Sequence, residues 1–255
     1  MTIWVEAGLW GLLAGSALVI GAAIAWFRTI PKPVTAGVMA FGAGVLISTL
    51  AFDLVEEAEA TGGLAATALG LLGGALAYVA ANIAVNRYGG DHRKRSEPKM
   101  QMSEEEMPGS GTAIAVGALL DGVPESIVLG MSLLGGGGVG VPVLAGIFIS
   151  NLPEGLSSSS GMKRNGRSAR YVFGVWGGIA VACGLAALLG CLAFEGASAR
   201  TVALINSLAA GAILAMIADT MIPEAFADAA QRYRLWTGLI TTIGFIVAFS
   251  ISHAG

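Results

Sequence analysis

Charged residues are scarce in this sequence. Asp, Glu, Lys and Arg make up 12% of its 255 residues, whereas soluble domains carry about 25%. This scarcity excludes an ordinary water-soluble domain. The net charge of −3 gives no sign of a basic surface, so a nucleic acid is not expected as a partner. Only two cysteines occur, Cys183 and Cys191, both inside one apolar run. They indicate neither a disulfide framework nor a zinc cluster, and we expect them to be buried small hydrophobic residues.

Histidine and the common catalytic motifs are also scarce or missing. The chain has two histidines, and His92, which lies in a charged loop, is expected to be solvated. Neither HExxH nor GxSxG nor a pair of GxGD-type aspartates occurs, so the chain is not expected to be an enzyme.

Apolar residues are abundant instead, at 55% of the chain, with a mean hydropathy of +0.75. Eight apolar runs are each long enough to cross about 30 Å of hydrocarbon as a helix. The sequence therefore predicts an all-α, polytopic membrane protein with one transmembrane domain over residues 1–255. The first run follows Glu6 and lacks a basic flank, so it is interpreted as a retained span rather than a signal peptide. The predicted spans are 5–27, 34–55, 64–85, 112–134, 141–162, 171–194, 201–222 and 235–253.

Basic residues predict the orientation of these spans. If the N-terminus lies outside the cytoplasm, all but one of the 14 basic residues fall in loops on the cytoplasmic side, and Arg200 alone lies outside. We therefore expect a cell-membrane protein with both termini outside the cytoplasm. The segment 86–111, with mixed charge, Pro and Gly, is predicted to be a flexible cytoplasmic loop.

Two pairs of antiparallel spans share a weak sequence repeat, which is typical of inverted-repeat transporters. The repeat predicts a 3+2+3 helix bundle. At an offset of 167, Ala43-Gly44 and Glu57-Ala58 match Ala210-Gly211 and Glu224-Ala225, and at an offset of 29, Gly117, Pro124 and Glu125 match Gly146, Pro153 and Glu154.

Carboxylates stand in the middle of spans 4 and 5. Asp121 and Glu125 are four residues apart, on one helical face, and each central charge costs about 2.5–3.5 kcal/mol on insertion scales. Pro124 and Pro153 cannot donate to the carbonyls four residues earlier, which adds bare oxygens. Such an oxygen-rich, negative cluster suits a divalent cation, although protonated acids that hydrogen-bond helices together stay an alternative. The candidate metal ligands are Asp121, Glu125, Ser150, Asn151 and Glu154.

Acids near the span ends extend this cluster into a candidate transport path. Asp53 and Glu57 lie at the outer end of span 2, and Asp219 and Glu224 lie at the inner end of span 7. Solvated helix ends are the alternative reading of these four. Small residues are interpreted as packing positions: Gly11–Gly15, Gly70–Gly74, Gly174–Gly178 and the serine run 157–160.

The motifs on four spans resemble those of the ZIP (ZRT/IRT-like) metal transporters. DGVPES on span 4 and SNLPEG on span 5 are similar to the family's HNxPEG motifs, and span 2 (GAGVLISTLAFDLVEEA) and span 7 (AGAILAMIADTMIPEA) are similar to its stretches ending in PEA. The resemblance implies uptake of zinc, iron(II) or manganese towards the cytoplasm, with the metal ion as substrate and Asp121, Glu125 and Glu154 as its main ligands.

Two departures from the family bear on the metal. Where the family commonly has histidine, this chain has Asp53, Asp121, Ser150 and Asp219, which favours harder cations such as manganese or iron(II). Span 6 carries no acid, so a second, bridging metal site is not expected. A proton- or ion-coupled carrier of a small organic solute is the alternative function, and the sequence leaves the oligomeric state open, a homodimer included.

Overall fold

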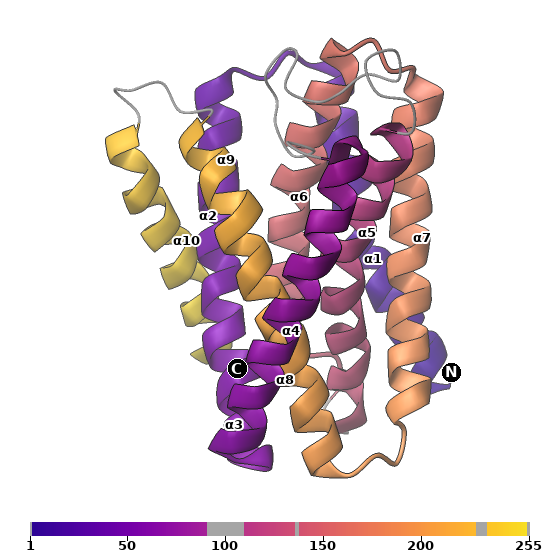
Figure 1. The fold of residues 1–255 in the computed structure, drawn as a ribbon, viewed down its shortest axis with the longest axis vertical. Coiled ribbons are helices and arrows are strands. Elements are labelled where there is room, and N and C mark those ends of the chain that lie inside the picture. Colours follow the sequence, from indigo (N-terminus) through magenta and orange to yellow (C-terminus); the bar gives the residue numbers. More distant parts are fainter. Residues whose placement is uncertain (1, 91–109, 136–137, 228–233, 254–255) are drawn as a thin grey trace.

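A computed structural model describes residues 2–90, 110–135, 138–227 and 234–253, and all regular structure in these ranges is helical (Figure 1). This confirms the predicted all-α class. The α-helices are α1 (Ile3–Phe27), α2 (Lys32–Thr49), α3 (Glu56–Gly62), α4 (Leu64–Val85), α5 (Ser110–Ser132), α6 (Val141–Arg164), α7 (Ala169–Phe194), α8 (Ala199–Met216), α9 (Ile222–Ala227) and α10 (Arg234–His253).

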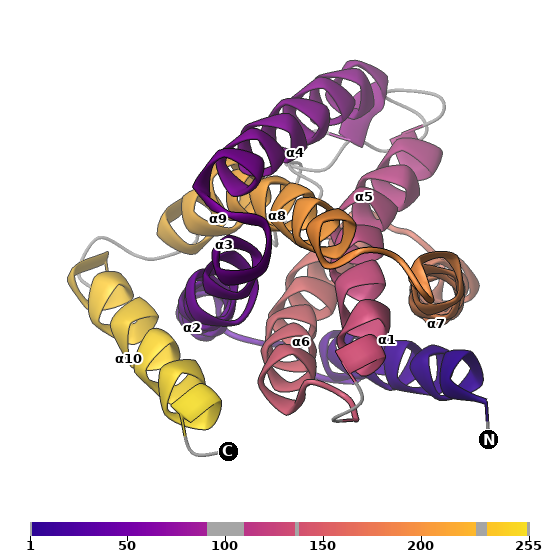
Figure 2. The ribbon, with the colours of Figure 1, turned by 90° about the horizontal axis from the view of Figure 1, so that it is seen from below.

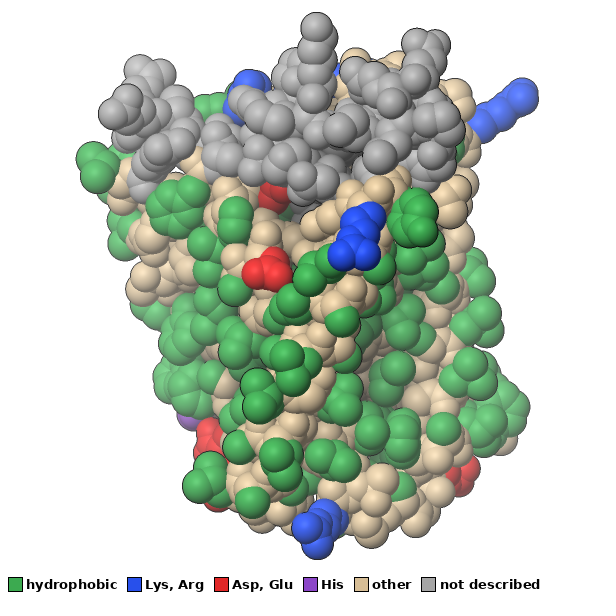
Figure 3. All heavy atoms as spheres, viewed as in Figure 1, with side chains coloured by type: hydrophobic (Ala, Val, Ile, Leu, Met, Phe, Trp, Pro, Cys, Tyr) green, Lys and Arg blue, Asp and Glu red, His purple; other side chains and the backbone are tan. Residues whose placement is uncertain are grey.

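Most predicted spans are long, apolar helices. Within the described ranges, seven helical runs are long and apolar enough to cross a membrane, and apolar side chains cover the middle of the face shown in Figure 3. The predicted fifth span is α6, which is helical but less apolar because it carries a run of serines. The protein is therefore a multi-span membrane protein, as the sequence predicts.

The helices form two groups that share few direct contacts. In one group α1 packs against α6 and α7, and α7 also packs against α5. In the other, α2 packs against α10 and α4 packs against α8. Figure 2 shows these groups on opposite sides of the molecule. They meet mainly where α2 contacts α6 and where α8, α4 and the turn after α4 contact α5, and α5 and α6 carry the central carboxylates at that junction.

The predicted inverted repeat is present in the backbone. Helices α2 and α8 each contain 18 residues, and both their first and last residues are related by the offset of 167. Each helix then widens into a π-helical segment, Leu50–Val55 after α2 and Ile217–Met221 after α8. These segments start at the same offset of 167 and lead into α3 and α9. Since π-helical segments often occur at functional sites, their repetition makes both spans candidates for part of a functional site.

Glycines allow the closest helix contacts of the repeat. A Cβ atom on Gly44 would overlap the carbonyl oxygen of Thr241 on α10, and a Cβ on Gly211 would overlap that of Leu71 on α4. Gly44 and Gly211 are repeat partners, so the pairs α2–α10 and α4–α8 use equivalent glycines. Small residues of this kind let helix backbones approach within a membrane.

The predicted packing glycines behave differently from one another. Gly11 and Gly15 lie against α7, and Gly70 and Gly74 lie against α8, which confirms both predictions. The prediction for Gly174–Gly178 is wrong, because a Cβ at either position would meet no described atom within 4 Å. Their spacing alone resembles a contact motif, but they lie on the exposed side of α7.

Two further predictions concern the loop after α4 and the two cysteines. The predicted loop 86–111 is shorter at both ends, because α4 continues as a π-helical turn over Asn86–Gly90 and α5 begins at Ser110. Residues 91–109, His92 included, lie outside the described ranges. Cys183 and Cys191 are free and buried, as predicted.

Candidate cation site at the centre of the bundle

Buried carboxylates lie at the middle of α5 and α6. Exposed fractions are 2% for Asp121, 2% for Glu125 and 5% for Glu154, and both helices continue through their internal prolines, Pro124 and Pro153. Burial of an ionised carboxylate is costly unless it has partners, a proton or an ion. The surroundings of each acid therefore decide what it can do.

Asp121 is held by a tyrosine of another helix. The Tyr78 hydroxyl of α4 donates a hydrogen bond to Oδ1 of Asp121 at 3.0 Å, and Tyr78 is 4% exposed. This hydrogen bond joins two helices, as expected if the buried acids serve to hold helices together rather than to bind a metal. Sequence reasoning missed Tyr78: a buried tyrosine hydroxyl needs a partner, but nothing in the sequence relates position 78 to position 121.

Ser150 and Asn151 of α6 both donate hydrogen bonds to backbone carbonyl oxygens. Asn151 Nδ2 donates to the carbonyl oxygen of Ala14 on α1 at 3.2 Å, and Ser150 Oγ donates to the Ile147 carbonyl at 3.0 Å. An amide oxygen and a hydroxyl lone pair are still suitable ligands for a hard cation. The hydrogen bond to Ala14 also fixes α6 against α1 beside Glu154.

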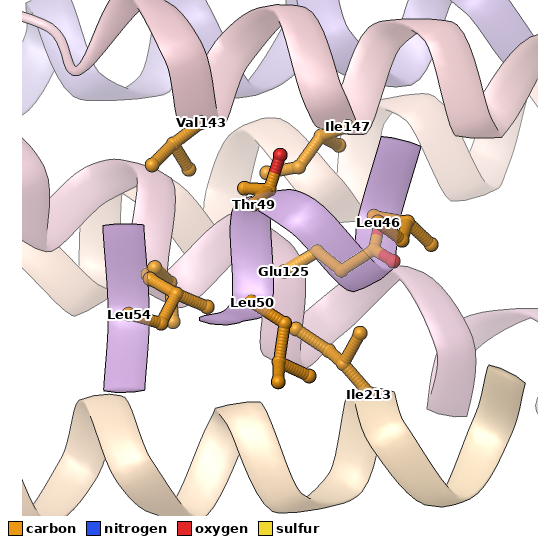
Figure 4. A pocket seen from close by; sticks show the side chains of 9 residues that line it. Leu46, Thr49, Leu50, Leu54, Glu125, Val143, Ile147 and Ile213 are labelled. Carbon is orange, nitrogen blue, oxygen red and sulfur yellow. The ribbon is translucent and has the colours of Figure 1, made fainter. Parts of the chain in front are cut away.

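Glu125 borders a small cavity between α5, α2, α6 and α8. Figure 4 shows its side chain with Thr49, Val143 and Ile147 on one side and Leu50 and Ile213 on the other. The cavity measures about 10 Å³, which is close to the space that one water molecule needs. Apolar atoms form its walls, so it is a dry space bordered by Glu125, and it is too small for an ion with its full hydration shell.

Thr49 is a second residue of this cavity that sequence reasoning missed. It is 3% exposed, and its Oγ1 has no hydrogen-bond partner among the described residues. This oxygen points towards Gly146 of α6 and away from Glu125 (Figure 4), so it would reach an ion at Glu125 only after a rotation of the side chain. In the sequence, a single threonine within an apolar run gives no sign of such a role.

The predicted ligands do not form a ready-made metal site. Among the described residues, no group of three or more His, Cys, Asp or Glu side chains is close enough to hold a metal ion. Asp121 and Glu125, which share a helical face, turn to different neighbours: Tyr78 of α4 and the cavity beside α2. The structure thus brings the predicted ligands into one region of the bundle without convergence on one point.

The predicted path acids lie away from the central cluster. Asp53 lies in the first π-helical segment, half-buried, and accepts a hydrogen bond from the Ser252 hydroxyl of α10, while Glu57 on α3 is exposed. At the other end, Asp219 in the second π-helical segment is exposed, whereas Glu224 on α9 is 6% exposed. The four acids therefore occupy the two ends of the bundle, as their positions in the sequence predict.

Comparison with known proteins identifies no family for this chain. No protein-family model matches it, and no curated protein sequence matches it. The resemblance to the ZIP transporters rests on the motifs quoted above.

Proposed function

We propose that the chain transports a divalent transition-metal cation across a cell membrane, towards the cytoplasm, through a site between α5 and α6. Manganese and iron(II) are the favoured substrates and zinc a weaker one, because oxygen atoms dominate the candidate ligands. The observation that carries the proposal is the burial of Asp121, Glu125 and Glu154, each at most 5% exposed, at the centre of a multi-span helix bundle.

Glu125 and Glu154 form the core of the proposed site. They are the matched acids of the repeat between spans 4 and 5, and Glu125 already faces a cavity of about 10 Å³. Asp121 joins them through its second carboxylate oxygen, while the Tyr78 hydroxyl donates to Oδ1 and orients the group. Ser150 and Asn151, one turn before Glu154 on α6, complete the oxygen set.

The proposed polarity follows from the basic residues. With 91–109 and the α6–α7 connection at the cytoplasmic side, both termini and Arg200 lie outside. Asp53 and Glu57 then belong to the entrance of the path, and Asp219 and Glu224 to its exit.

Binding and uptake by the purified protein test the proposal. In reconstituted vesicles we expect saturable Mn²⁺ uptake, and calorimetry should give an affinity that Glu125→Gln and Glu154→Gln each reduce at least about 100-fold, since each removes a ligand charge at nearly constant volume. Glu6→Gln, at the start of α1, is the matched control and should bind like the wild type.

The pH dependence provides a second readout. Metal binds carboxylates in their deprotonated form, so protons compete with the ion, and affinity should fall as the pH is lowered. Calorimetry in two buffers of different ionisation enthalpy should show proton release. Unchanged affinity in Glu154→Gln, or binding without proton release, would contradict the oxygen-ligand site. Proton-coupled uptake of an organic solute with no metal binding would favour the alternative carrier.

A further inference from the structure

A second cavity opens at the end of the bundle where α3, α5 and α7 end and α6 and α8 begin. Its volume is about 540 Å³, far larger than the cavity beside Glu125. Polar side chains reach it from separate helices, among apolar residues. They are Glu57 and Thr61 of α3, Ser132 of α5, Glu195 after α7 and Asn206 of α8.

This cavity adjoins the one that holds Glu125. Leu54, Val128 and Val143 line both cavities, one on each of three helical spans. These three side chains therefore form the boundary between a wide polar chamber and the narrow space beside Glu125. An ion that reached the central carboxylate from this end would pass through the chamber and then between these apolar side chains.

The chamber has the electrostatics of a cation site. Glu57 and Glu195 both line it and are exposed. Glu195 caps the C-terminal end of α7, where the helix dipole is already negative, and the last turn of α7 holds no basic residue. The negative end of the helix and the Glu195 carboxylate therefore add to the same negative potential at the chamber.

Asn206 supplies an independent observation. Its side chain lines the chamber and is 6% exposed, yet its Oδ1 atom has no hydrogen-bond partner among the described residues. A buried amide oxygen without a partner is uncommon and costs free energy. The atom itself is covered in this structure, and a rotation of the Asn206 side chain would let a water bound to a cation in the chamber satisfy it.

We propose that this chamber is a capture site for a hydrated divalent cation, in which Glu57 and Glu195 bind the ion through its water shell and Asn206 orients that shell. The chamber is wide enough for a hydrated ion, whereas the cavity beside Glu125 is not, so the ion loses water at the boundary formed by Leu54, Val128 and Val143. This inference rests on the proposed transport function and extends it to the site of first contact.

Uptake kinetics of the full chain in vesicles test the capture site with Mn²⁺ as the probe. The double variant Glu57→Gln/Glu195→Gln should raise the KM about tenfold, the loss expected for two water-mediated charge contacts, with kcat and the calorimetric affinity of the central site unchanged. The difference from wild type should shrink at high salt. The matched control is Glu6→Gln/Glu59→Gln, which removes two acids outside the chamber and should change the KM less than about twofold.

Cysteine labelling provides a readout that does not depend on transport. Ala199 lines the chamber and is exposed, so Ala199→Cys should react with an impermeant thiol reagent, and Mn²⁺ should slow the reaction unless Glu57 and Glu195 are also replaced by Gln. An unchanged KM in the double variant, or labelling indifferent to Mn²⁺, would overturn the capture site while the transport proposal stands. Failure of the wild type to bind or move any divalent cation would instead overturn the transport proposal.

Discussion

The two π-helical spans share one backbone plan but offer their acids different surroundings. Glu57 and Glu224 are repeat partners at the offset of 167, yet Glu57 is exposed and lines the chamber of about 540 Å³, whereas Glu224 is 6% exposed. The backbone repeat thus coexists with unequal exposure of its two acids. If the proposed transport function holds, such inequality between repeats is expected in one state of an alternating-access cycle.

The apolar side chains of the two π-helical segments sharpen the comparison. Leu50 and Leu54 correspond to Ile217 and Met221 at the same offset, and all four are at most 7% exposed. Leu50 and Leu54 border the cavity of Glu125. Met221 approaches Gly42 of α2, beside Pro153 of α6. The first pair thus borders Glu125, and Met221 of the second pair lies close to Pro153, the residue before Glu154.

The largest effect is expected from substitutions at the two equivalent glycines, Gly44 and Gly211, that allow close helix contacts in both repeats. Gly44→Ala and Gly211→Ala should each destabilise the protein by about 3 kcal/mol, because the new methyl group overlaps a backbone carbonyl and the helix pair must separate. Thermal unfolding in detergent measures this loss. Gly73→Ala and Gly238→Ala are the controls: nothing lies within 4 Å of a Cβ there, so these variants should keep or gain up to about 1 kcal/mol. Equal stability of all four variants would refute the shared contact.

Labelling of introduced cysteines should detect the difference in exposure between positions 57 and 224. With an impermeant thiol reagent, Glu57→Cys should react from outside intact cells, and Glu224→Cys should react at least about tenfold more slowly from either side, since a buried group reacts only when the structure opens locally. Wild-type protein, in which Cys183 and Cys191 are buried, gives the background rate. Similar labelling rates at both positions would contradict the difference in exposure between Glu57 and Glu224.

Turnover should separate the proposed exit from the central site. Asp219→Asn should lower kcat for Mn²⁺ uptake severalfold and leave calorimetric affinity near that of wild type, because Asp219 is exposed at the end of α8 and does not reach the buried acids. Glu59→Gln, an exposed acid at the opposite end, serves as the control. An affinity loss in Asp219→Asn equal to that of Glu154→Gln would place both residues in one site.

The smallest effect is expected from loss of the Tyr78–Asp121 hydrogen bond, which joins the two helix groups at the candidate cation site. Tyr78→Phe removes the hydroxyl that donates to Asp121 and should cost about 0.6 kcal/mol, the average for hydrogen bonds between membrane helices. Because only one of the acceptor positions of Asp121 loses its donor, Mn²⁺ affinity should change less than about threefold. Chemical unfolding and calorimetry measure the two quantities, and a large affinity loss would show that Tyr78 is needed to position the ligand.

The spans were predictable because hydropathy records burial in lipid directly. The eighth predicted span, 235–253, differs by one residue from α10, and the buried acids of α5 and α6 were identified from their cost in an apolar run. The second span was predicted to end at 55, but its helix continues to Gly62 through Glu56, Glu57 and Glu59. Polar side chains end a hydropathy run without ending the backbone hydrogen bonds.

Other parts of the site depend on contacts that no local pattern encodes. The Tyr78–Asp121 bond joins residues 43 positions apart, and the bond from Asn151 to Ala14 joins residues 137 apart. The π-helical segments also have no distinctive composition, so the repeat offset was the only sign of their equivalence. Both hydrogen bonds and the π-helical segments depend on how the helices pack against one another. That packing results from many contacts between distant residues, so no short stretch of sequence predicts it.

The modest hydropathy of α6 has a consequence for how the protein is made. Among the described long helices, α6 is the one not apolar enough to cross a membrane by composition alone, and its serines 157–160 are buried against neighbouring helices. Its main partner is α1, which leaves the ribosome more than a hundred residues earlier. The first helix must therefore wait, unpaired on that face, near the insertion machinery until α6 emerges. Membrane integration of this chain is then a cooperative event between its beginning and its middle.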